Sequence, residues 1–77
     1  MEWQTRISFD AKVCHGQACI KGTRVMVSLV MDNLAAREPA SAIATAHRIS
    51  AEDIEATLHY AAELAKGQVI PLSAGVA

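Results

Sequence analysis

The chain has 77 residues, a formal net charge of −1, 52% hydrophobic residues and one each of Trp, Tyr and Phe. This length makes one domain with a small core that gains from self-association, so we expect a homo-oligomer, a dimer. The near-neutral charge excludes bulk attraction to nucleic acid, and no apolar run approaches the roughly 18 residues of a membrane span. Because the N-terminus, with Glu2 and Arg6, also lacks the apolar region of a signal peptide, we expect a cytoplasmic protein without membrane contact.

The first quarter of the chain is predicted to form a β-hairpin. Apolar and polar residues alternate over Ile7–Phe9, which is typical of a short, half-buried strand. Ala18–Ile20 is the expected partner strand, because His15–Gln17 provides a flexible turn between the two. Gly16 and Gly22 are therefore predicted to be structural turn residues, since glycine adopts backbone conformations that other residues resist.

Two helices are predicted after the hairpin. From Val27 to about Ala36, apolar residues recur every three or four positions and indicate one buried helix face. Proline fits the first turn of a helix but not its interior, so a second, short helix is expected from Pro39 to His47. Ile43 is its main apolar anchor.

A third helix is predicted to begin after Ser50 and to stop at Gly67. Ser50 and Asp53 have the spacing of a capping box, in which the side chain of each residue bonds the backbone amide of the other. The apolar residues of this helix are expected on two adjacent faces, one with Ile54, Leu58, Ala61 and Ala65, the other with Tyr60 and Leu64.

The predicted architecture is one domain, residues 1–67, followed by a flexible tail, residues 68–77, which has no apolar period. Within the domain, the fold class is mainly α. A short N-terminal β-hairpin precedes a three-helix, homeodomain-like (helix-turn-helix) bundle.

Five short blocks of the chain have a sequence and spacing typical of one family. They are Ile7–Asp10, Val13–Gly16, Cys19–Arg24, Glu52–Ile54 and Tyr60–Leu64. Over about residues 7–66, the chain resembles the domain-of-unknown-function family numbered 433. The resemblance implies a homeodomain-like fold and an antitoxin, in the manner of VapB antitoxins, whose partner is a PIN-like toxin encoded nearby. The chain departs from the family pattern where proline is common, at Ala11, Ala18 and Met26.

Both cysteines lie in the hairpin region, close to a histidine. A structural zinc needs four ligands, and Cys14, His15 and Cys19 supply a single set, so we expect no metal. Adjacent residues of a strand point to opposite faces, which argues against Cys14 and His15 as nucleophile and base. We predict that Cys14 and Cys19 are buried thiols. With no acid–base pair standing out elsewhere, we expect neither enzymatic activity nor a cofactor.

Positive charge is concentrated at the hairpin end. Residues 1–25 carry four cationic and two anionic side chains, whereas the remainder carries three and six. Lys21, Thr23 and Arg24 surround a glycine and lead toward a helix N-terminus, which makes them candidate contacts for a partner or an anion. The alternative is that Arg24 pairs with an acidic residue such as Asp53 or Glu52 and ties the hairpin to the bundle.

Two functions follow as hypotheses. The first is a non-enzymatic antitoxin that neutralises a PIN-like ribonuclease toxin by placing a basic residue or the tail among its active-site carboxylates. The second is a DNA-binding autorepressor. The third helix is acidic and repels phosphates, so the DNA contacts are expected on the hairpin side, at Arg6, Lys12, Lys21 and Arg24.

Overall fold

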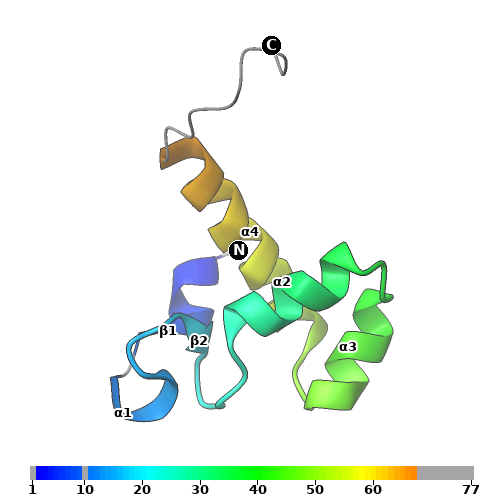
Figure 1. The fold of residues 1–77 in the computed structure, drawn as a ribbon, viewed down its shortest axis with the longest axis horizontal. Helices are drawn as coiled ribbons and strands as arrows, with labels where there is room; N and C mark the ends of the chain where they lie inside the picture. The colour runs from blue at the N-terminus through cyan, green and yellow to red at the C-terminus, as the bar shows by residue number, and fades with distance from the viewer. Residues whose placement is uncertain (1, 10, 68–77) are drawn as a thin grey trace.

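A computed structural model describes residues 2–9 and 11–67 of the chain. The predicted fold class is confirmed, because a two-stranded antiparallel hairpin is followed by three helices (Figure 1). The predicted tail, residues 68–77, lies outside the described residues. In the part of the chain that is described, no helix is both long and apolar enough to cross a membrane.

The hairpin consists of β1 (Ile7–Ser8) and β2 (Cys19–Ile20), which pair with Ile7 opposite Ile20. The pairing continues beyond the strands, since the backbone N–H of Lys21 donates to the carbonyl of Arg6 at 2.8 Å. Both strands lie within the predicted segments. The hairpin thereby brings the start of the chain beside the loop that leads into the helices.

Two short helices near the hairpin were missed by the sequence analysis. A 3-10 helix, η1 (Trp3–Arg6), precedes β1, and a single α-helical turn, α1 (Ala11–Cys14), lies between the strands. One turn of helix has no apolar period, so nothing in the pattern of residues could indicate either of them. His15 and Gly16 follow α1 with φ angles of 54° and 79°, and this left-handed backbone reverses the chain toward β2.

The three main helices are α2 (Val27–Ala35), α3 (Ala40–His47) and α4 (Ala51–Gly67). Their bounds agree with the predicted ones to within a residue. Arg37 and Arg48 follow α2 and α3 with φ angles of 68° and 55°, so each of these helices ends in a left-handed residue.

The predicted capping box at the start of α4 is confirmed. The backbone N–H of Asp53 donates to Ser50 Oγ at 3.1 Å, and the N–H of Ser50 donates to Asp53 Oδ2 at 3.0 Å. Two amides that the first turn would leave without a partner are satisfied in this way. The turn between α3 and α4 is therefore tight and well defined.

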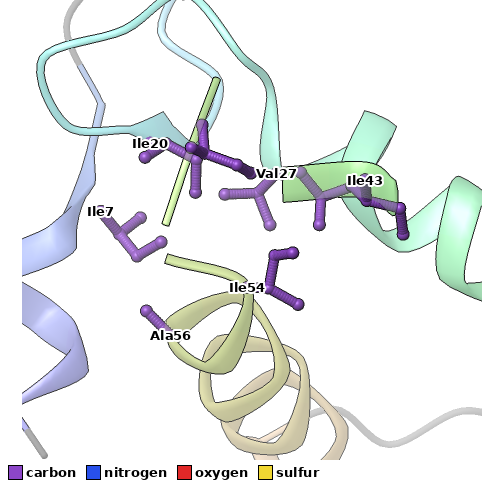
Figure 2. Close-up of a cluster of buried hydrophobic side chains, with 8 residues drawn as sticks. Ile7, Ile20, Val27, Ile43, Ile54 and Ala56 are labelled. Carbon is purple, nitrogen blue, oxygen red and sulfur yellow. The ribbon is translucent and has the colours of Figure 1, made fainter. Parts of the chain in front are cut away.

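The core is built from aliphatic side chains that converge from the hairpin and all three main helices (Figure 2). Its buried members are Ile7, Ile20, Val27, Val30, Ile43, Ile49, Ile54 and Ala56. Trp3 and Tyr60 pack against this cluster from outside, so aromatic rings border the core and do not fill it.

The packed face of α4 differs from the expected one. Ala56 and Thr57 are fully buried, whereas Leu58, which was assigned to the same face as Ile54, is 53% exposed. The reason is that the Thr57 hydroxyl donates to the carbonyl of Asp53 at 3.1 Å, so a polar residue can occupy a core position. All of residues 62–67 are exposed, and the end of α4 projects beyond the rest of the domain (Figure 1).

Candidate functional site

The loop between β2 and α2 holds the basic segment that the sequence singled out, and its backbone is closed by internal hydrogen bonds. The N–H of Thr23 donates to the carbonyl of Ile20 at 3.0 Å, and Gly22 between them has φ 81°. The Thr23 hydroxyl donates to the same carbonyl at 2.7 Å and accepts from the N–H of Val25 at 3.0 Å. Thr23 therefore holds the loop in shape, and its role as a partner contact stays a prediction.

The charged side chains of this loop point outward. Lys21 and Arg24 are both exposed. The start of α2 is less open to an anion, because the N–H of Val27 is already engaged by the carbonyl of Ala18 at 3.0 Å. The loop thus presents two exposed cationic side chains on a fixed backbone, beside a helix start whose Val27 amide is already engaged.

Cys19 belongs to the structural side of this loop. It is fully buried with a free thiol, and its Sγ lies 3.4 Å from the carbonyl oxygen of Thr23 and 3.8 Å from Ser8 Oγ. The side chain of Cys14 is outside the described part of the structure. Among the described residues, no group of three or more His, Cys, Asp or Glu is placed to hold a metal ion.

The alternative in which Arg24 pairs with Asp53 is wrong, because Asp53 pairs with Arg6. Arg6 Nη1 lies 3.0 Å from Asp53 Oδ1 and ties η1 to the start of α4. Burial alone raises the pKa of Asp53, but hydrogen bonds from Ser50 and Arg6, together with the charge of Arg6, outweigh it and lower the pKa below its ordinary value. Of the four cations predicted to contact DNA, Arg6 is thus committed to the fold, whereas Lys12 is exposed on α1.

The solvent side of α4 is acidic. Its exposed charged or titratable side chains are Glu52, Glu55, His59, Glu63 and Lys66. Lys66 Nζ lies 3.3 Å from Glu63 Oε1, so part of this charge is locally paired, and His59 Nε2 lies 3.9 Å from Glu55 Oε1. A helix with this charge pattern is unsuited to the major groove of DNA.

An apolar hollow between the hairpin, α2 and α4 was not found by the sequence analysis. We call it the Tyr60 hollow; its volume is about 200 Å³, and its lining residues are Gln17, Ala18, Val27, Ser28, Met31, Tyr60 and Leu64. Three separate segments build it, which no local pattern reveals. The one available signal was that Tyr60 and Leu64 share a helix face one turn apart.

Tyr60, which lines the hollow, also contacts two aromatic rings, and Leu64 in the same lining is exposed. Phe9 is 57% exposed and packs its ring edge against Tyr60 with 6.0 Å between ring centroids, and Leu64 is 38% exposed. The ring of Trp3 packs against the same tyrosine, with 5.9 Å between the ring centroids. The hollow thus combines an aromatic ring and aliphatic side chains with two polar lining residues, Gln17 and Ser28.

The comparisons with known proteins give one match. A family model with the description Protein of unknown function (DUF433) matches residues 7–61, from the start of β1 into α4. No curated protein and no solved structure was found to match the chain. Because the family match covers well over half of the chain, this protein belongs to the DUF433 family.

Proposed function

We propose that this protein is a non-enzymatic antitoxin that binds and neutralises a PIN-like ribonuclease toxin encoded nearby. The observation that carries the proposal is the Tyr60 hollow, which exposed Leu64 lines and whose Tyr60 contacts the exposed ring of Phe9. Apolar surface left open on so small a domain is typical of a protein–protein contact. The class of toxin is inferred from the resemblance that the Cys-His-Gly and Gly-Thr-Arg blocks carry.

Neutralisation is assigned to the basic loop. A PIN-like active site gathers carboxylates around a divalent cation, so a cationic side chain placed there competes with the metal and obstructs RNA. Lys21 and Arg24 are exposed on a loop whose backbone is fixed by hydrogen bonds. A preorganised loop loses little conformational entropy on binding, which suits it to this role.

The first experiment co-expresses the protein with the toxin encoded beside it. We expect the two to co-purify and growth inhibition by the toxin to be relieved. Ser28→Arg projects a long charged side chain at the Tyr60 hollow and should abolish co-purification, whereas Ala42→Arg, at an exposed position of α3, should not. Failure of the wild type to co-purify together with undiminished toxicity, or equal binding by the two variants, contradicts the proposal.

The second experiment separates binding from inhibition. Lys21→Glu combined with Arg24→Glu should leave the complex intact by pull-down while ribonuclease activity returns. Arg37→Glu reverses another exposed arginine, outside this loop, and should still inhibit. Full inhibition by the double variant would assign neutralisation to another part of the chain.

A DNA-binding autorepressor is the second proposal, supported by the exposed cations of the hairpin side, Lys12, Lys21 and Arg24. Binding to the promoter of its own gene is measured by fluorescence anisotropy over a range of salt concentrations. Genuine contact gives a log–log slope of about −0.9 per neutralised phosphate, and Lys21→Glu should make the slope shallower. No binding even at low salt rejects this proposal.

A further inference from the structure

We propose that two copies of this chain pair through the outer face of α4, antiparallel, with Leu58 of each copy against Ala62 of the other. The outer face is the surface formed by Glu55, Leu58, Ala62 and Ala65. Leu58 is 53% exposed, and a shallow depression of about 310 Å³ is lined by Glu55, Leu58, His59 and Ala62. This inference goes beyond the proposed function and does not depend on it.

The spacing of the outer face suits helix pairing. Glu55, Leu58, Ala62 and Ala65 recur at intervals of three, four and three residues, which places them in one stripe along the helix. The small alanines allow two helix backbones to approach closely, and the larger leucine fills the space beside the partner's alanine. Tyr60 and Leu64 lie on another face of α4, so each copy keeps its Tyr60 hollow available.

The position of Lys66 favours the antiparallel orientation. The outer side of α4 carries Glu52 and Glu55 toward its start, and Glu63 together with Lys66 toward its end. With Leu58 opposite Ala62, Glu55 of one copy is level with Ala65 of the other. Lys66 of that second copy is one residue, about 1.5 Å, further along the axis, so it lies beside Glu55 of the first copy. A parallel pair would instead place equal acids side by side, and antiparallel helix dipoles also attract.

Lys66 can leave Glu63 of its own chain and pair with Glu55 of the second copy. Its side chain is 72% exposed, and its contact with Glu63 at 3.3 Å is a surface pair, which contributes little to stability. Replacing that contact with Glu55 of the second copy therefore has a low cost. The exposed end of α4, residues 62–67, would gain a neighbouring helix over its last turns.

The test measures the dimer dissociation constant of the full chain, without any toxin, by sedimentation equilibrium. We expect the wild type to dimerise and Leu58→Glu to weaken the dimer at least about tenfold. Leu29→Glu is the matched control, because Leu29 is 40% exposed on α2, outside the outer face. Circular dichroism confirms that each variant is folded. A monomeric wild type, or a dimer that Leu58→Glu leaves unchanged, overturns the proposal.

A charge exchange tests the orientation. Glu55→Lys and Lys66→Glu should each weaken the dimer, because like charges then meet between the copies. The two changes in one chain should restore it, because position 55 of each copy then carries a lysine beside the glutamate at position 66 of the other. A double variant that stays weaker than both single variants overturns the antiparallel arrangement. Neither experiment contains the toxin, so its outcome is independent of whether the antitoxin proposal holds.

Discussion

The two ends of α4 are held very differently. At its start, the capping box and the Arg6–Asp53 pair fix the backbone, and Ile54, Ala56 and Thr57 are buried. At its end, residues 62–67 are all exposed. One helix therefore has two different parts: the first completes the core, and the last lies on the surface.

The largest expected effect comes from truncating the buried end of α4. Ile54→Ala should lower the free energy of unfolding by about 2–5 kcal/mol, because it leaves a cavity in a small core. Leu58→Ala, one turn later and 53% exposed, should cost less than about 0.5 kcal/mol in the monomer. Urea denaturation followed by circular dichroism, at concentrations that keep the chain monomeric, measures both.

Should Ile54→Ala fail to fold, Ile54→Val keeps the comparison testable at an expected cost of about 1 kcal/mol. Equal losses in the free energy of unfolding at positions 54 and 58 would show that the exposed face of α4 stabilises the monomer as much as its buried face does.

A smaller loss in the free energy of unfolding is expected when Gly22, in the loop after β2, is replaced. Gly22 has φ 81°, and a Cβ built there meets no atom within 4 Å. Gly22→Ala should therefore cost about 1–2 kcal/mol through backbone conformation alone. Gly67→Ala is the matched control, because its Cβ also meets nothing and its φ is not positive; it should be neutral or slightly stabilising. Thermal unfolding measures both variants. A Gly22→Ala variant as stable as the wild type would show that the left-handed backbone at this position does not require glycine.

Removing the charge of Asp53 should lower the free energy of unfolding by about 1 kcal/mol, because it weakens both the cap of α4 and the ion pair with Arg6. The pKa of Asp53 in the folded chain lies below its ordinary value of 3.8. The stabilisation from this group is therefore complete above that value and is lost as the pH falls through the lower, folded value. Asp53→Asn should remove this part of the pH dependence.

Denaturation of the wild type and of Asp53→Asn at a series of pH values from neutral to acidic measures this difference. The gap in stability should be constant near neutrality and close in the acid range. A gap that widens as the pH falls would reverse the sign of the linkage.

The smallest effect is expected at the exposed end of α4. Ala65→Gly should change the free energy of unfolding by less than about 0.5 kcal/mol, because the last turns can fray without disturbing the core. Ala42→Gly, at an exposed position within α3, should cost closer to about 1 kcal/mol. Comparable losses at the two positions would indicate that the end of α4 is coupled to the whole domain.

Most of the fold could be predicted from the sequence, because the deciding signals are local. The apolar spacing from Val27 onward, Pro39, and the Ser50–Asp53 cap each indicated a boundary that the structure has. The turn at Gly22 is equally local. What these elements share is that neighbouring residues determine them.

The features that the sequence did not reveal depend on contacts between distant segments. Asp53 pairs with Arg6 and not with Arg24, because the missed helix η1 places Arg6 against the start of α4. The Tyr60 hollow likewise needs three segments to come together. Thr57 misled the assignment of the packed face, since a sequence pattern counts it as polar although its hydroxyl is satisfied within the helix.

The contact between Arg6 and Asp53 also bears on the order in which the chain folds. The two residues are 47 positions apart, whereas the hairpin and the turns between helices join near neighbours in the sequence. Closing so long a loop is slow compared with local contacts, so we expect η1 to dock after the helices have formed. Arg6→Ala should then accelerate unfolding and leave the folding rate nearly unchanged. During synthesis, η1 leaves the ribosome before the three main helices and would reach its native place after them.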